Sequence, residues 1–247
     1  MEQQNYQYKE AINYTQERSI SKRFFGNVFL WMFVALAVSS ATAYFFYENE
    51  SILRQYLMKE TGGFSILGYI AIFAPLGLVF LMGGAMQKLS FPALAGLFIL
   101  YSVLTGVMLS FILLIYATTS IAICFMAACA IFGVMAVMGY TTDVDLSKFG
   151  PILMAGVIGL VIISVVNMFL QSDSLGYILG FIGVAIFTAL TAFKVQEIKR
   201  IGQGLDAEGN TISVEDSNKL ALMGALSLYI TFINLFLSLL RIFGDRR

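Results

Sequence analysis

A line of polar side chains within an apolar segment near the C-terminus has the greatest potential for chemistry in this sequence. At about 100° per residue, positions that recur at intervals of four, three, four and three fall on one arc of an α-helix. Two interpretations fit: hydrogen bonds to neighbouring helices, worth about 0.6–2 kcal/mol each in membranes, or a hydrated path through a bundle. The residues are Ser227, Thr231, Asn234, Ser238 and Arg241.

A second candidate is Lys194, which follows a long apolar run in "TALTAFKVQEIKR". One interpretation places its amine at the membrane surface, with the aliphatic stem buried. The other turns it inward toward the polar line, with Glu197 one helical turn later as its charge partner. A lysine at the bilayer centre costs about 2.5–3.5 kcal/mol on insertion scales, so the surface placement has the lower cost.

Two more polar residues have expected structural roles. Asn167 is the lone polar residue in "VVNMFL", and we expect it to hydrogen-bond between helices. Asp145 lies just before the same apolar segment. We expect it to cap that helix, because a carboxylate accepts backbone N–H bonds and suits the positive helix end.

Membrane helices must position these residues. The chain has 247 residues, of which 59% are hydrophobic and only 12% charged, whereas soluble domains have roughly 25% charged residues. Runs such as "IGLVIISVVNMFL" do not alternate as the strands of a membrane barrel would. We therefore predict an all-α integral membrane protein within a lipid bilayer. A span needs about 20 apolar residues, and seven segments qualify: 24–47, 66–86, 91–116, 120–140, 149–170, 175–193 and 220–243.

The predicted domain organisation is simple. Residues 1–23 form a polar N-terminal tail, residues 24–243 form one seven-helix membrane domain, and residues 244–247 form a short C-terminal tail. Positive residues favour the cytoplasmic side, so we predict a cytoplasmic N-terminus. The N-terminal side carries Lys9, Arg18, Lys22, Arg23, Lys88, Lys148, Lys199, Arg200 and Lys219, against Arg54, Lys59, Arg241, Arg246 and Arg247 on the other.

The inventory of reactive residues argues against several classes of protein. Histidine is absent, and none of the 15 acidic residues lies within the body of a predicted span. We therefore predict no enzyme, no metal site and no cofactor, since hydrolytic and metal chemistry need such groups. The 15 basic residues balance the acidic ones, and no basic patch is interleaved with aromatics, so nucleic acid is not an expected partner.

Three stretches together resemble a known family. "TDVDLSKFGPILMAGVIGLVIISVVNMFL", "AFKVQEIKRIGQG" and "LMGALSLYITFINLFLSLLRIFG" are similar to the bacterial branch of the transmembrane Bax inhibitor motif family, also called the Bax-inhibitor-one family. The resemblance implies six helices around a central seventh. It also implies a passive, pH-sensitive calcium leak and a location in a bacterial plasma (inner) membrane.

The sequence departs from the family at the gate that the resemblance implies. The family places one aspartate near the end of the sixth helix and one in the seventh, and this chain has Lys194 and Thr231 there. Two carboxylates in contact share a proton, which a lysine with a threonine cannot do. We therefore expect permeation of calcium or another cation with altered gating or ion preference. The alternative is a non-conducting regulator that binds other membrane proteins, such as a membrane-anchored protease.

Overall fold

The computed structural model describes residues 2–59, 63, 65–204 and 214–245. Within helices, the side chains of residues 2–21 and 214–215 are also outside the description. The orientation prediction depends in part on such side chains, those of Lys9 and Arg18, and on Arg246 and Arg247, which lie beyond the described residues.

Most of the described residues lie in helices, as the apolar runs predict. Seven of these helices are long and apolar enough to cross a membrane. Backbone polar groups have no water to bond within lipid, and a helix satisfies them internally. In chain order the elements are α1 (Glu2–Glu48), α2 (Glu50–Leu57), α3 (Ile66–Ala85), α4 (Phe91–Ile115), α5 (Thr118–Thr141), a short 3₁₀ helix η1 (Leu146–Phe149), α6 (Gly150–Leu170), α7 (Asp173–Gly202) and α8 (Val214–Phe243).

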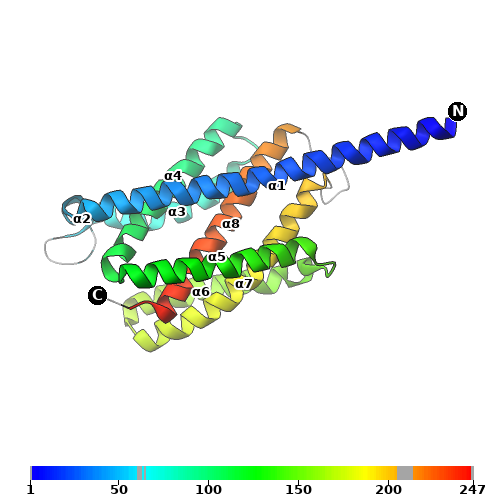
Figure 1. Cartoon of the computed structure of the whole chain (residues 1–247). Coiled ribbons are helices and arrows are strands. Elements are labelled where there is room, and N and C mark those ends of the chain that lie inside the picture. Colours follow the sequence, from blue (N-terminus) through cyan, green and yellow to red (C-terminus); the bar gives the residue numbers. More distant parts are fainter. Residues whose placement is uncertain (1, 60–62, 64, 205–213, 246–247) are drawn as a thin grey trace.

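Two helices extend well beyond the predicted spans. α1 includes all but the first residue of the segment predicted as a polar tail, and its N-terminal part projects past the other helices (Figure 1). α7 continues beyond residue 193 to Gly202. Apolar length therefore locates the membrane-crossing part of a helix and leaves its polar extensions undetermined.

α8 is the central helix of the bundle (Figure 1). It is the most buried of the seven candidate spans and packs extensively against α1, α4, α5 and α7. α3 packs mainly on α4, and α6 packs on α7, so these two helices hold more peripheral positions. The predicted fold class is confirmed.

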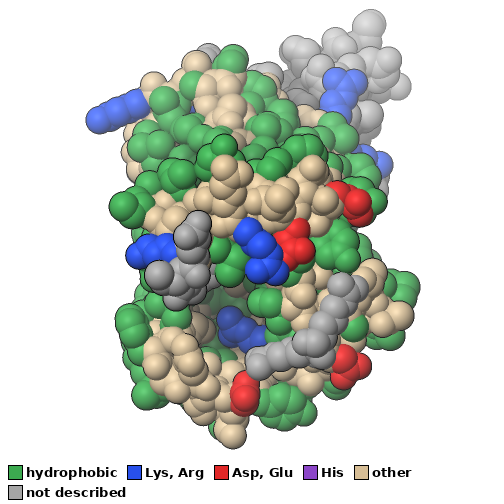
Figure 2. Space-filling model, turned by 90° about the vertical axis from the view of Figure 1, so that its left-hand side faces the viewer, with side chains coloured by type: hydrophobic (Ala, Val, Ile, Leu, Met, Phe, Trp, Pro, Cys, Tyr) green, Lys and Arg blue, Asp and Glu red, His purple; other side chains and the backbone are tan. Residues whose placement is uncertain are grey.

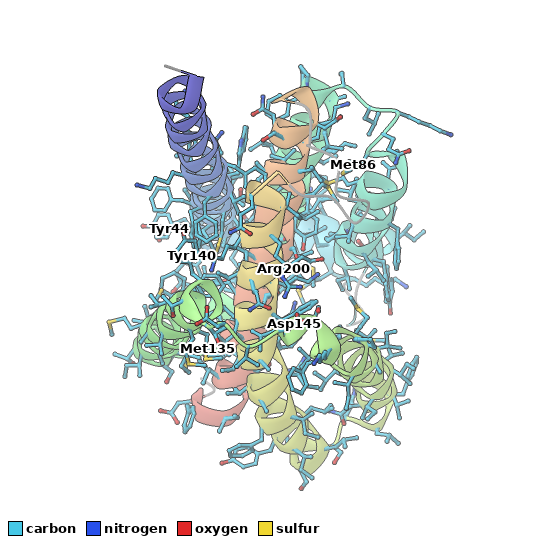
Figure 3. The ribbon with its side chains drawn as sticks, turned by 90° about the vertical axis from the view of Figure 1, so that its right-hand side faces the viewer. Tyr44, Met86, Met135, Tyr140, Asp145 and Arg200 are labelled. Atoms are coloured by element: carbon cyan, nitrogen blue, oxygen red, sulfur yellow. The ribbon has the colours of Figure 1, made fainter. Side chains whose placement is uncertain are left out.

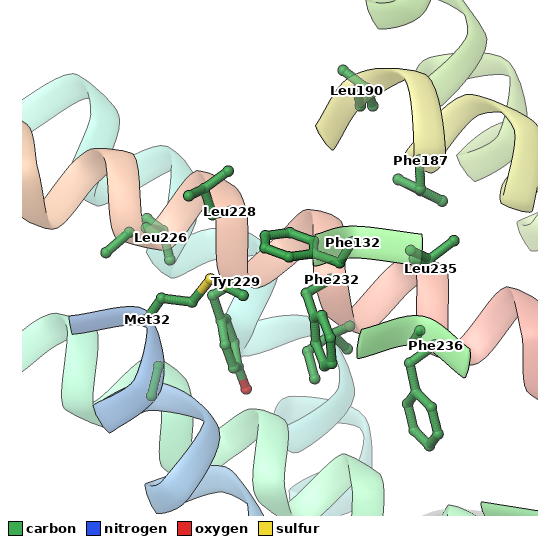
Figure 4. Packing of buried hydrophobic residues seen from close by; sticks show 14 of the residues in the cluster. Met32, Phe132, Phe187, Leu190, Leu226, Leu228, Tyr229, Phe232, Leu235 and Phe236 are labelled. Atoms are coloured by element: carbon green, nitrogen blue, oxygen red, sulfur yellow. The ribbon is translucent and has the colours of Figure 1, made fainter. Parts of the chain in front are cut away.

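The core is built around apolar residues of α8 (Figure 4). Tyr229 and Leu235 are fully buried, and the rings of Phe125 and Phe132 each meet Phe232 nearly edge-on with centroids 5.5 Å apart. Lipid tails are as apolar as these side chains, so the helices are held by close packing rather than by escape from water. The outer surface of α6 is correspondingly apolar, with residues such as Ile152 and Phe169 exposed.

Candidate functional site

The interface between α7 and α8 brings together most of the candidate residues. Glycines on one helix contact side chains on the other at two levels. A Cβ added to Gly183 would lie 3.1 Å from the Cβ of Ser238, and one added to Gly224 would lie 3.3 Å from Cγ1 of Ile198. These contacts show that the two helices are antiparallel and set which residues lie level with each other. A residue further along α7 lies level with a correspondingly earlier residue of α8.

Lys194 lies on the face of α7 that meets α8. Gly183 and Ile198 both contact α8, and Lys194 is separated from each by close to a whole number of helical turns. Its Nζ atom is 2.8 Å from Oε2 of Glu197 and 5.1 Å from the centroid of the Phe193 ring. The Lys194 side chain is 19% exposed and that of Glu197 is 46% exposed. The lysine is thus largely covered and has the charge partner that its spacing predicts.

Thr231 lies on the matching face of α8. Gly224 and Ser238 both contact α7, and Thr231 is seven residues from each, which is close to two turns. The register places Thr231 level with Leu190 and Thr191, so Thr231 and Lys194 lie on facing surfaces about one turn apart along the interface. Cβ atoms point toward the N-terminus of their own helix, so the Cα–Cβ bonds of these two residues incline toward each other.

The polar line on α8 is hydrogen-bonded within its own helix. The hydroxyl of Thr231 donates to the carbonyl oxygen of Ser227 at 2.8 Å, and the hydroxyl of Ser238 donates to that of Asn234 at 2.7 Å. The amide of Asn234 donates to the carbonyl oxygen of Ile230 at 2.8 Å. Between the described residues, these donors bond within α8 and not to another helix. The oxygen lone pairs of both hydroxyls remain available as acceptors.

Gln196, near the C-terminal end of α7, is hydrogen-bonded to the connection between α5 and α6. The buried amide of Gln196 accepts from the backbone N–H of Leu146 and donates to the carbonyl of Val144, each at 2.8 Å. The sequence interpretation missed Gln196. The signal was a lone amide within the helical segment "FKVQEIK", two residues after Lys194.

An exposed ion pair between Asp145 and Arg200 joins the same two segments. Asp145 accepts from the backbone N–H of Ser147 and thereby caps η1 rather than α6. It also pairs with Arg200, beside which it lies in Figure 3. The hydroxyl of Ser147, followed by Arg200, holds the pKa of Asp145 well below its usual range. Arg200 was assigned only to the positive-inside count, and this contact gives it a structural role.

The opposite end of the α7–α8 interface opens into a polar cavity of about 740 Å³. Arg241 and Asn167 both line it. Oδ1 of Asn167 accepts from the backbone N–H of Ser172 at 3.2 Å, so Asn167 ties α6 to the following turn. This end of the molecule is hollowed, with a basic side chain inside the hollow (Figure 2). We call this space the Arg241 cavity.

The described residues contain no group of three histidine, cysteine or acidic side chains placed to hold a metal ion. Cys124 is buried in the core, whereas Cys129 is exposed on the surface of α5.

Comparison with known proteins identifies close relatives over almost the whole chain. Residues 21–247 match the family described as inhibitor of apoptosis-promoting Bax1. The chain is 37% identical to the inner membrane protein YbhL of Escherichia coli, over 97% of this chain and 99% of that protein. It is 39% identical to an uncharacterized protein of Borreliella burgdorferi (96% of this chain, 99% of that protein). It is also 40% identical to one of Rickettsia prowazekii (92% and 91%).

Proposed function

The chain belongs to the Bax inhibitor-1 family of multipass membrane proteins, and from this membership we propose that it lets ions cross the bilayer passively along the α7–α8 interface. Calcium leak is the activity that the family resemblance implies. The proposal includes a bacterial inner membrane, which is where the relative YbhL is named, and a cytoplasmic N-terminus.

One observation carries this proposal. The polar line of α8 faces α7 along its length, from Arg241 in the polar cavity at one end to the level of Lys194 at the other. Polar side chains in a membrane are costly and concentrate along ion or substrate pathways. The hydroxyls already donate within α8, so their oxygens present acceptors to a passing cation.

The gate of this pathway differs from a pair of carboxylates. Lys194 and Glu197 form an ion pair within one helix, and Thr231 carries no charge. Glu197 is the more exposed partner, so solvent screens its charge more than that of Lys194, and the remaining positive field repels a divalent cation more strongly than a monovalent one. We therefore propose slow calcium passage that lacks the steep dependence on pH near neutrality that a shared proton produces.

Flux into proteoliposomes tests the proposal directly. Purified protein is reconstituted, and calcium and potassium entry are followed with internal dyes between about pH 6 and 8, the range in which carboxylate pairs of raised pKa titrate. Replacing Lys194 by Gln removes the covered cation and should raise calcium entry. Lys148→Gln is the matched control, because Lys148 is exposed on the predicted cytoplasmic side. Entry of both ions no faster than into empty liposomes rejects permeation.

A second candidate function is supported by α1. Its N-terminal part projects beyond the bundle (Figure 1) and offers a helix to another membrane protein. Under this alternative, the protein conducts nothing and regulates a partner such as a membrane-anchored protease. Deleting residues 2–20 should then abolish co-purification of the partner and leave the bundle folded. Ion flux that survives this deletion would reject the alternative.

A further inference from the structure

The Arg241 cavity contains a basic group without a carboxylate partner among the described residues. Their ion pairs are Arg54 with Glu50, Lys194 with Glu197, and Arg200 with Asp145. Arg241 is in the last turn of α8 and lines the cavity wall. Arg241 is exposed to the cavity, and its guanidinium group has five N–H donors and no acceptor, so an anion or a carbonyl oxygen is a suitable partner.

The surrounding groups also favour an anion. α7 begins at Asp173 on the cavity wall, so the positive end of this 30-residue helix faces the same space. Ser164 and Ser172 add polar groups to the wall. Asp173 is the acidic exception, and it has an interaction of its own. An anion would therefore bind beside Arg241 rather than fill the cavity evenly.

The size and position of the cavity indicate what kind of anion fits. Its volume of about 740 Å³ falls within the roughly 300–1,000 Å³ of small-molecule pockets. It lies at one end of the bundle, where the apolar spans of α6 and α8 end and that of α7 begins. Tyr116 and Tyr177 line it, and tyrosine is enriched where membrane spans meet the interface between lipid and water. Phosphate is the abundant anion at a headgroup surface, and its geometry suits the planar fork of arginine.

We propose that the Arg241 cavity is a phosphate-binding site, which takes either the phosphodiester of a lipid headgroup or a free phosphate ion. The site does not require conduction. It gives Arg241 a counter-charge, since Arg241 belongs to none of the ion pairs between described residues.

Two probes distinguish the sources of phosphate. Purified full-length protein in phosphate-free maltoside micelles is titrated with inorganic phosphate or with short-chain phosphatidylglycerol, at constant ionic strength, and the unfolding temperature is recorded. A saturable rise with the lipid alone identifies a headgroup site, and a saturable rise with inorganic phosphate identifies a free-anion site. Either result supports the proposal if the variants below respond as expected.

Three variants assign the effect to the cavity. Arg241→Gln should raise the apparent Kd at least about tenfold, because the charge-assisted hydrogen bonds of the guanidinium group to the phosphate are lost. Arg54→Gln is the matched control, because Arg54 is an exposed arginine already paired with Glu50, and it should leave Kd unchanged. Asp173→Asn removes a nearby negative charge and should tighten binding.

The same measurements define failure. The absence of a saturable rise with either probe in the unmodified protein overturns the proposal, as does equal binding by Arg241→Gln. If Arg241→Gln does not fold, binding that Asp173→Asn fails to tighten counts against the site. None of these readouts measures flux, so permeation can fail while phosphate binding holds, and the reverse.

Discussion

Replacing Gly183 by alanine tests whether close approach of α7 and α8 holds the bundle together. The added methyl group would overlap the hydroxyl of Ser238 and lie 3.1 Å from its Cβ atom. Overpacking of this kind costs about 1–3 kcal/mol. The hydroxyl would also have to leave the carbonyl of Asn234, a bond worth about 0.5–1.5 kcal/mol. Alanine regains about 0.5–1 kcal/mol of helix preference over glycine.

The net expectation is a loss of about 2 kcal/mol in the free energy of unfolding, measured by equilibrium unfolding in mixed micelles with increasing SDS. Gly133→Ala in α5 is the matched control, because nothing lies within 4 Å of the added atom. It should be neutral or stabilise the protein by about 0.5–1 kcal/mol. The companion change Ser238→Gly removes the overlapping atoms and should recover part of the loss. Equal effects of the two alanine variants would refute the packing argument.

Three further predictions follow from the contacts near the interface. Gln196→Ala strands two backbone groups and should destabilise the protein by about 1–3 kcal/mol, whereas Gln196→Glu should retain one of the bonds; SDS unfolding measures both. Replacing Lys194 and Thr231 together by Asp should give ion flux a steep pH dependence, and an unchanged profile in liposomes would show that the two positions do not interact. Because the Ser147 hydroxyl and then Arg200 lower the pKa of Asp145 from 3.8, these two contacts stabilise the fold most above about pH 4. The thermal advantage over Asp145→Asn should therefore shrink progressively as the pH falls from about 4 toward the lowered folded-state pKa, and an advantage that does not change between about pH 5 and pH 2 would contradict this assignment.

Much of the fold could be predicted from apolar length alone. Seven uninterrupted apolar runs are long enough to cross a bilayer, and only helices satisfy their backbone there. The arc from Ser227 to Arg241 was also predictable, because helical periodicity places these residues on one side of α8. The neighbouring helix that the arc faces could not be predicted, because periodicity within one helix carries no information about its neighbours.

The interpretation of Lys194 shows the same limit. Its spacing to Glu197 predicts the ion pair, which is local to one helix. Which face of α7 carries Lys194 depended on which residues of α7 contact α8, and the glycine contacts supplied that information. Gln196 was missed for a related reason, since its partners Leu146 and Val144 lie about 50 residues away in the chain.

The sequence by itself determined the membrane helices, the family and the absence of an aspartate pair at the expected gate positions. These are properties of composition, of short-range periodicity and of residue identity at matched positions. Only the tertiary structure decided that the polar line of α8 faces α7 and that Arg241 opens into a polar cavity. Helix packing in lipid depends on the fit of small residues such as Gly183 against partners distant in the chain, and no local pattern encodes that fit.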